Sequence, residues 1–490
     1  MTSTRLHNFL FLLILVTTIF CFTFKLLQIP PGLETDEGSI SYNSILISQN
    51  LRDQNKRLLP FFILSSDHVD WKQPVLIYSS AILFKIFGAS LTAFKLVNVL
   101  YSLGASILIY IIARLLIKEK YYALIAMVFY VISPIIISTT RIGNESILPA
   151  FFGSLWLLLV TIYYKKNQNI YLFLSALALG IGFYSFKGMR IIIPVWSALT
   201  IALIAIKNKF SRQSLKPIII FGLTMAPFAL IIPFLESKYP GAIFDRSSIP
   251  IEGYRYYLHY WLANINLYAL FSEPDIGKIY EMKYFGAMLV STMPLLIVGL
   301  YALTIKTKLH RFILAVFFLT PILFGIAKST EYSHRLVSLV PLYALISTFG
   351  VRHIVVSKHF KYKRLSLILL TLFITFNSLD FFNYYFFVYP KQLSTQKAFS
   401  NNYFPLFLEL SKESKAKNLE PYIQSDLYFG HNDANLFYEQ AYFKKPLNIW
   451  KLGDPMPSNS ILLTQVNHLD DAVTLKNISS SPDSYLLLSK

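Results

Sequence analysis

A pair of adjacent carboxylates stands just beyond the first apolar run of the chain. Asp36 and Glu37 follow the apolar stretch 8–27. A carboxylate at the mouth of a membrane cavity can take a proton from an acceptor hydroxyl, while its neighbour holds a substrate or a cation. Acidic residues also favour the first turn of a helix, where the dipole and the free N–H groups stabilise them. The pair therefore predicts either catalytic chemistry or the start of an interfacial helix.

A second polar segment, residues 67–74, places carboxylates, an imidazole and an ammonium next to a proline. Lys72 lies just before Pro74, where an apolar piece begins, and an ammonium beside a helix start at membrane depth can hold a lipid phosphate. Asp67 and His68 are of metal-ligand types, but their spacing gives a divalent metal only weak support, so no metal site is predicted. The alternative is an ordinary polar loop.

Further charges stand in short loops between apolar runs. Arg141 and Glu145 are four residues apart, a spacing that suits an ion pair, and charges near a membrane interface also tend to be functional. The remaining cations fall on the side of the membrane where cations are disfavoured, and these are Lys187, Arg190, His334 and Arg335. A polyprenyl phosphate would compensate them through charge-assisted hydrogen bonds. Snorkelling to anionic membrane lipids is the alternative.

The composition indicates a membrane protein rather than a soluble one. Of 490 residues, 54% are hydrophobic and 14% are charged, whereas soluble domains carry about 25% charged residues. The single Cys21 excludes a disulfide framework within the chain. The net charge of +19 comes from lysines and arginines in short loops between apolar runs, a pattern that records membrane orientation and argues against a nucleic-acid partner.

Apolar runs predict an all-α polytopic membrane protein with about eleven transmembrane helices. The piece 74–88 is short for a span and suits an interfacial or re-entrant helix. Leaving it out places the basic loops together on one side, which is the cytoplasmic side by the positive-inside rule, with the N-terminus. The predicted spans are 8–27, 91–116, 121–140, 146–164, 170–186, 190–206, 216–234, 285–305, 311–327, 335–356 and 364–387.

This topology divides the chain into a transmembrane catalytic domain, residues 1–387, and a small extracytoplasmic α/β domain, residues 388–490. The outer loops 28–90 and 235–284 belong to the first domain and carry much of the candidate chemistry. The cytoplasmic (plasma) membrane is the predicted location.

In their order along the chain, these elements resemble the membrane-embedded GT-C glycosyltransferases of the protein O-mannosyltransferase and aminoarabinose-transferase group, family 39 and its relatives. The resemblance covers roughly residues 8–390, and the Asp-Glu pair is its most specific part. The elements that carry it are Asp36-Glu37, Lys72-Gln73-Pro74, a helix end at Gly88, Arg141 with Glu145, and His334-Arg335 before the span with Pro341.

The resemblance implies inverting transfer of a sugar from a polyprenyl-phosphate donor, usually without a metal or other cofactor. Asp36 would deprotonate the acceptor, Glu37 would assist or position the sugar, and Glu145 would help hold acceptor or donor. The candidates for the lipid phosphate are Lys72, Arg141, Lys187, Arg190, His334 and Arg335. Gln73 departs from the family's Lys-Pro-Pro, which puts the backbone beside Lys72 in doubt.

The predicted function is therefore a glycosyltransferase at the outer face of the membrane, with a lipid-linked sugar as donor. Its acceptor would be a protein, lipid or glycan. The chain carries no Walker loop, dinucleotide fingerprint or HExxH motif. A lipid-linked glycan flippase is the alternative, although transporters tend to show an internal repeat that is not found here. A scaffold that displays the C-terminal domain would not need Asp36, Glu37 and Lys72 at the membrane mouth.

Overall fold

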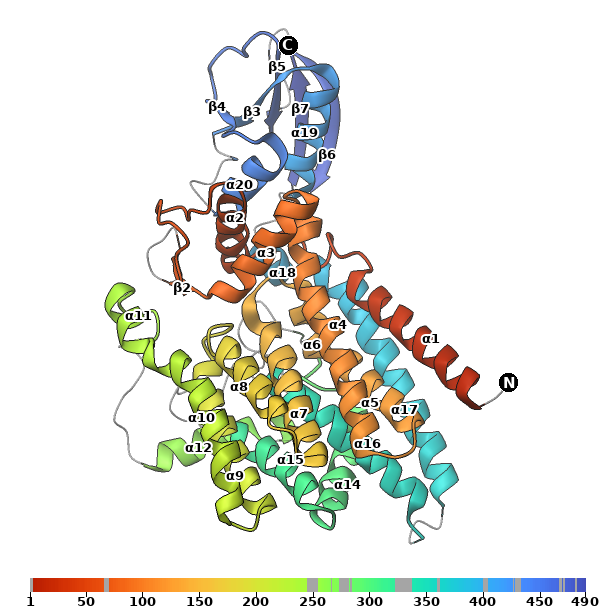
Figure 1. Cartoon of the computed structure of the whole chain (residues 1–490). Coiled ribbons are helices and arrows are strands. Elements are labelled where there is room, and N and C mark those ends of the chain that lie inside the picture. Colours follow the sequence, from red (N-terminus) through yellow and green to blue (C-terminus); the bar gives the residue numbers. More distant parts are fainter. Residues whose placement is uncertain are drawn as a thin grey trace.

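The chain forms a bundle of helices with a small mixed sheet at one end (Figure 1). Helices α2 and α3 lie between the sheet and the bundle, and the long helix α4 runs from this junction into the bundle. The computed structural model describes residues 3–65, 70–244, 254–265, 267–272, 282, 284–321, 337–358, 362–399, 404–425, 427, 433–466, 469, 472–480 and 483–490.

Helices make up most of the described chain. They are α1 (Ser3–Thr23), α2 (Thr35–Asn50), α3 (Pro74–Phe87), α4 (Leu91–Leu116), α5 (Tyr121–Val131), α6 (Pro134–Arg141), α7 (Leu148–Lys166), α8 (Ile170–Phe183), α9 (Met189–Lys207), α10 (Leu215–Leu230), α11 (Ile232–Lys238), α12 (Tyr254–Asn264), α13 (Leu267–Phe271), α14 (Met293–Thr304), α15 (Lys308–Leu319), α16 (Val340–Val356), α17 (Lys363–Asn383), α18 (Leu393–Ala398), α19 (Phe404–Lys417) and α20 (Asp433–Tyr438). Short π-helical segments follow α17 and α20, at Tyr384–Val388 and Glu439–Phe443.

The predicted polytopic membrane architecture is confirmed. Within the described residues, seven helices are long and apolar enough to cross a membrane, or eight if the bent pair α5 and α6 forms one span. Helices α3 and α8 and the segment Val290–Thr304 are apolar but shorter. The count of eleven spans stays a prediction, and part of the predicted span 311–327 lies outside the described residues.

The predicted span 121–140 is not one straight helix. Helices α5 and α6 meet at a bend of 63°. Ser133, the residue before Pro134, has a ψ of 122°, because proline disfavours the helical conformation of its predecessor and has no N–H of its own. The next N–H, of Ile135, donates instead to the carbonyl of Ala287 at 3.2 Å. The bend directs α6, and with it Arg141, away from the axis of α5.

Helix α3 begins and ends where the sequence predicts. Pro74 occupies its first turn, and Gly88 ends it with a φ of 82°, a conformation that favours glycine. Fourteen residues are too few to cross a bilayer, which takes about 20. Ile82, Ile86 and Phe87 are exposed together, and this apolar surface suits a helix that lies in the membrane interface.

The C-terminal residues form the predicted mixed α/β structure. The strands are β3 (Glu420–Gln424), β4 (Asn448–Trp450), β5 (Ser460–Thr464), β6 (Val473–Ser480) and β7 (Asp483–Ser489). They pair in the order β4-β3-β5-β7-β6, with β3 parallel to both of its neighbours and β7 antiparallel to both of its own. Helix α19 packs on this sheet. A domain boundary at residue 388 stays a prediction.

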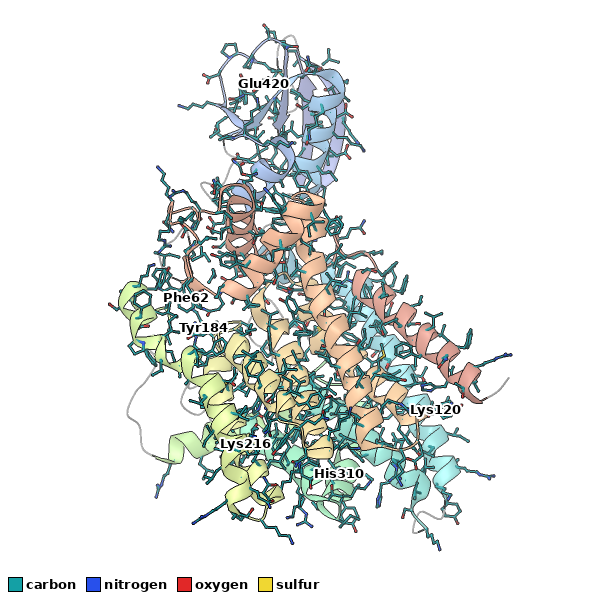
Figure 2. The ribbon with its side chains drawn as sticks, in the orientation of Figure 1. Phe62, Lys120, Tyr184, Lys216, His310 and Glu420 are labelled. Atoms are coloured by element: carbon teal, nitrogen blue, oxygen red, sulfur yellow. The ribbon has the colours of Figure 1, made fainter. Side chains whose placement is uncertain are left out.

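Basic residues of the short loops gather at the end of the bundle away from the sheet. Figure 2 shows Lys120, Lys216 and His310 toward that end, whereas Glu420 marks the sheet at the opposite end. This arrangement agrees with the predicted orientation, in which basic loops and the C-terminal sheet face opposite sides of the membrane.

Helices α14 and α16 approach each other closely through two glycines. A Cβ atom on Gly299 would lie 1.9 Å from the carbonyl oxygen of Ile346, and one on Gly350 would lie 2.0 Å from that of Leu295. Small residues permit such backbone contact between membrane helices, where packing drives association.

We expect Gly299→Ala to destabilise the protein by about 1–3 kcal/mol, because the added methyl forces α14 and α16 apart. Thermal unfolding in detergent would measure the loss. Gly222→Ala in α10 is the matched control, since a Cβ there meets no atom within 4 Å. Equal melting temperatures for the two variants would contradict the close packing of α14 on α16.

Candidate active site

The first turn of α2 contains Asp36 and Glu37, the acidic pair that the sequence analysis singled out. Glu34 is the N-cap, and its carboxylate accepts a hydrogen bond from the N–H of Asp36 at 3.0 Å. The carboxylate of Glu37 accepts in return from the N–H of Glu34 at 3.0 Å. This reciprocal capping box fixes the first turn of the helix. Asp36 and Glu37 thus do begin a helix, as one of the two interpretations predicted.

Glu37 faces the protein interior. Its Oε1 accepts hydrogen bonds from the Lys95 ammonium at 3.1 Å and from the N–H of Gly143. Glu37 and Lys95 are both fully buried. Their contacts give no support to the predicted contact of Glu37 with the sugar. Lys95 was missed by the sequence analysis, although a lone cation within the apolar run of α4 is a signal of function or of a buried partner.

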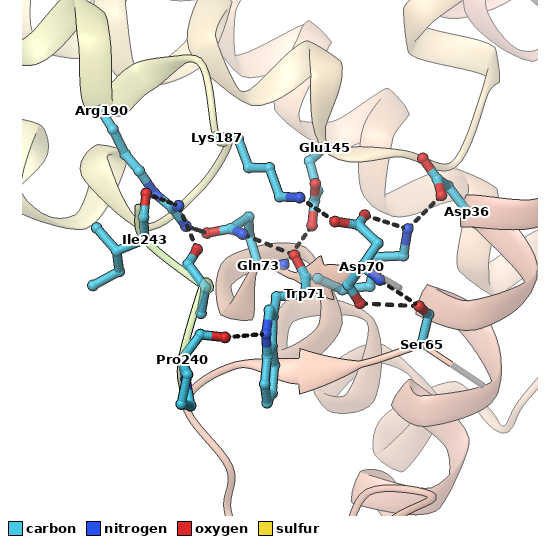
Figure 3. Close-up of polar contacts among 12 residues, drawn as sticks. Asp36, Ser65, Asp70, Trp71, Gln73, Glu145, Lys187, Arg190, Pro240 and Ile243 are labelled. Atoms are coloured by element: carbon cyan, nitrogen blue, oxygen red, sulfur yellow. Dashed lines mark hydrogen bonds and ion pairs between the residues drawn. The ribbon is translucent and has the colours of Figure 1, made fainter. Parts of the chain in front are cut away.

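Asp36 projects in another direction and meets Lys72. Strands β1 (Ile63–Leu64) and β2 (Trp71–Lys72) pair antiparallel and place Lys72 beside the start of α2. The Lys72 ammonium donates to Asp36 and, at 2.9 Å, to Asp70. Lys187 pairs with the other oxygen of Asp70 (Figure 3). We call Asp36, Asp70, Lys72 and Lys187 the charged cluster.

Within the charged cluster, Asp36 is exposed to solvent and Lys72 is buried. The side chain of Asp36 is 52% exposed, whereas that of Lys72 is 4% exposed. Burial alone would lower the pKa of Lys72, but the carboxylates of Asp36 and Asp70 raise it above its usual range. Burial alone would raise the pKa of Asp70, but Lys72 and Lys187 lower it below its usual range. Lys72 therefore stays cationic and Asp70 stays anionic at neutral pH.

Gln73, the departure from the family motif, connects the cluster to two predicted residues. Its backbone N–H donates to Glu145 Oε1 at 2.6 Å, a bond that proline could not make. Its side-chain oxygen accepts from Arg190, which also donates to the backbone carbonyl of Ile243 at 3.1 Å (Figure 3). Glu145 and Arg190 thus hold the segment that carries Lys72, and the doubt about this backbone is resolved by a defined set of hydrogen bonds.

Arg141 lies apart from the charged cluster. Its guanidinium donates to the backbone carbonyls of Ile29 at 3.1 Å, Phe22 at 3.0 Å and Phe24 at 2.6 Å. These groups lie at or just beyond the end of α1, where helix carbonyls lack intrahelical partners. Arg141 is fully buried, so its contacts fix the end of α1 and do not support the predicted contact with a lipid phosphate.

Some predicted residues are outside the described part of the chain. These are His334 and Arg335, predicted for the lipid phosphate, and Asp67 and His68, considered as metal ligands. Among the described residues, no group of three or more His, Cys, Asp or Glu side chains is arranged to hold a metal ion. Of the described candidates, the structure thus brings together Asp36, Lys72, Glu145, Lys187 and Arg190, whereas Glu37 and Arg141 make their contacts elsewhere.

The segment 71–236 matches the family model described as dolichyl-phosphate-mannose-protein mannosyltransferase. A search of curated proteins finds no match. ArnT from Cupriavidus metallidurans, in a crystal structure bound to undecaprenyl phosphate, is similar with a TM-score of 0.54 and 9% identity over 99% of this chain and 98% of that one. The archaeal oligosaccharyltransferase AglB from Archaeoglobus fulgidus, in complex with an inhibitory peptide and a dolichol-phosphate, has a TM-score of 0.51 and 12% identity over 90% of this chain and 64% of that one.

These likenesses show that the chain has the fold of the GT-C membrane glycosyltransferases. The family match and the fold together confirm the resemblance that the sequence predicted. The matched segment contains Lys72, Gln73, Glu145, Lys187 and Arg190 and does not contain the start of α2.

We expect Glu37→Gln and Lys95→Met each to destabilise the protein by about 3–5 kcal/mol, because each leaves a buried charge without its partner. The double variant removes both charges, so it should be more stable than the sum of the single effects predicts. Thermal unfolding of the four proteins in detergent measures this coupling. Strict additivity would show that the pair does not interact in the folded protein.

The pH dependence of stability should carry a contribution from Glu34. Burial, then repulsion from Asp36 and Glu37, raises its pKa to about 8. The folded state binds this proton more tightly than the unfolded chain does, so the stabilisation is complete below the unfolded pKa and is lost as the pH rises through about 8.

Glu34→Gln keeps an acceptor for the Asp36 N–H and removes the titration. We expect the variant to melt at a higher temperature than the wild type at pH 9, with a smaller difference at pH 6. Asp454→Asn, which changes an exposed carboxylate, is the control. A variant that tracks the wild type at both pH values would exclude a raised pKa at Glu34.

Proposed function

Because the chain has the GT-C fold and its segment 71–236 matches the mannosyltransferase family model, we propose that it is an inverting glycosyltransferase with a polyprenyl-phosphate-linked sugar as donor. The observation that carries this proposal is the charged cluster, in which a half-exposed carboxylate, Asp36, stands beside buried cationic charge at Lys72. A base and a phosphate site within reach of each other are what the transfer requires.

In this proposal Asp36 acts as the base. It takes the proton of the acceptor hydroxyl as the hydroxyl oxygen bonds to the anomeric carbon of the sugar. The bond between that carbon and the phosphate oxygen breaks on the opposite face, and its electron pair leaves with the phosphate. Configuration at the anomeric carbon is therefore inverted, and a second catalytic carboxylate is not needed.

Lys72 and Lys187 are proposed to bind the donor phosphate. In the structure both ammonium groups pair with the Asp70 carboxylate, which thus stands where an anion is favoured. A donor phosphate would take over these contacts or join them, and the two cations would stabilise the charge that grows on the leaving phosphate. Glu145 and Arg190 are proposed to position Lys72 through Gln73 rather than to contact the sugar.

The donor's lipid tail has an apolar cavity beside the cluster. The cavity has a volume of about 440 Å³ and is lined by α3, α8 and α10, including Pro74, Tyr78 and Phe228. Pro74, which follows Lys72 and Gln73 in the chain, is one of its lining residues, and we propose that a phosphate at the cluster would have its tail in this cavity. Because the tail would leave lipid rather than water, packing against the lining residues, and not hydrophobic transfer, would favour this placement.

The remaining features of the proposal concern place and partners. The chain is a multi-pass membrane protein, and we propose the cytoplasmic membrane, with the N-terminus inside and the charged cluster and C-terminal sheet outside. The acceptor would be a hydroxyl or similar nucleophile of a protein, lipid or glycan. The sugar is a hexose or pentose in this proposal. A flippase gains no support from the family match.

We expect Asp36→Asn to lower the rate of sugar transfer by about 10²- to 10⁴-fold, because the amide cannot accept the acceptor proton. Purified protein in detergent would be supplied with radiolabelled undecaprenyl-phosphate hexoses and pentoses and with acceptor extracts. Donor binding, measured on the same samples, should persist. Asp380→Asn, at an exposed position of α17, is the matched control and should keep the wild-type rate.

Two outcomes would contradict parts of the proposal. Transfer undiminished in Asp36→Asn would keep the enzyme class and exclude Asp36 as the base. Donor binding without turnover in the wild type, across all donors and acceptors, would instead favour the flippase.

A further inference from the structure

The C-terminal residues reach the catalytic end of α2. Helix α20 packs against α2, and the two helices are in close contact at Gly38, two residues after Asp36. A Cβ atom on Gly38 would lie 2.7 Å from the backbone nitrogen of Ala434 and 3.2 Å from its Cβ. Only a glycine permits this approach without a shift of α20. This contact therefore involves the first turns of α2, next to Asp36.

Phe437, one turn further along α20, packs against the helices next to α2. It is fully buried, and its ring lies 6.3 Å from that of Phe84 in α3 and 6.1 Å from that of Phe94 in α4. Phe94 in turn contacts Gly143, where a Cβ would lie 2.3 Å from the ring. The N–H of Gly143 holds Glu37. A chain of contacts thus runs from Phe437 to the neighbour of Asp36.

The segment that follows α20 is fastened to the start of α4. The N–H of Leu91, the first residue of α4, donates to the Tyr442 hydroxyl at 3.1 Å. The carbonyl of Tyr442 accepts from Ser411 at 3.1 Å and from Lys415 at 2.8 Å, both in α19. Because α19 packs on the C-terminal sheet, α20 and its π-helical extension connect that sheet to both α2 and α4.

We propose that residues 404–490 are a positioning part of the active site, acting through Gly38, Ala434 and Phe437. They set the orientation of the first turn of α2, and hence the place of Asp36 relative to Lys72. This inference rests on the proposed function. It assigns the C-terminal sheet and its helices a role in turnover, in place of an independent domain carried by the membrane part.

The contacts of α20 lie on the side of α2 opposite to Asp36. The base stands at the exposed side of α2, and the opposite side is held by Lys95, Gly143 and α20. A small displacement of α20 would turn α2 about its N-terminal anchor and move Asp36 away from the acceptor oxygen. A misplacement of about 1 Å can lower a rate by about 10²-fold without weakening substrate binding to the same degree.

The test uses the full chain in detergent and the variants Gly38→Ala, Phe437→Ala and Phe437→Leu. Gly222→Ala is the matched glycine control, since a Cβ there meets no atom within 4 Å. We expect kcat to fall by about 10- to 100-fold in Gly38→Ala and Phe437→Ala. Donor KM should stay within about twofold, because the phosphate contacts of Lys72 and Lys187 are untouched. Phe437→Leu should recover most of the rate.

Amide hydrogen exchange of residues 34–50 provides a second readout that does not need turnover. We expect faster exchange there in Gly38→Ala and Phe437→Ala than in the wild type or Gly222→Ala, at temperatures where all four proteins remain folded. Gly38→Ala serves if Phe437→Ala does not fold.

The outcomes separate the two proposals. A wild type without transferase activity, but with faster exchange in the two variants, would overturn the proposed function and keep the structural coupling. An active wild type with unchanged kcat and exchange in Gly38→Ala would overturn the positioning role alone. A rise in donor KM equal to the loss of rate would also overturn it, because that pattern reports lost donor binding.

Discussion

The hydrogen bonds to the buried carboxylate of Glu37 are the interaction on which the proposed active site depends. The carboxylate accepts from the N–H of Glu34, the N–H of Gly143 and the ammonium of Lys95, and so joins the start of α2 to α4 and to the loop after α6. At a buried position these bonds are strong, and leaving any one unmade would be costly. Successive helix residues point about 100° apart, so anchoring Glu37 inward turns Asp36 toward the open side.

Further hydrogen bonds and ion pairs position the rest of the site relative to Glu37. The pairing of β1 with β2 brings Lys72 to Asp36, and Gln73 fastens the same segment to Glu145 and Arg190. The Arg141 guanidinium donates hydrogen bonds to backbone carbonyls just beyond the end of α1. The proposed catalytic residues thus lie on short elements whose positions are fixed by buried polar contacts with the long helices, an arrangement that limits their movement.

The sequence analysis identified most of the charged cluster because a largely apolar chain carries charged residues at a membrane interface only where they have a role. Asp36, Lys72 and Lys187 stand out in this way, whereas their pairing through Asp70 depends on an approach between positions 117 residues apart, which no local pattern encodes. The bend at Pro134 and the cation Lys95 were visible in the sequence and were missed. The contact of Gly38 with Ala434 could not be predicted, because it depends on the tertiary placement of the C-terminal residues.

The charged cluster contains two ammonium groups and two carboxylates, so its formal charges cancel before substrate arrives. In the proposed reaction Asp36 becomes neutral just as the carrier lipid turns from a phosphodiester into a more highly charged monoester. The spent carrier is then held by a site with surplus positive charge. In the proposed reaction, loss of that proton from the exposed Asp36 side chain to water restores the cancelling charges and weakens the attraction for the spent carrier, so resetting the base favours release of the lipid.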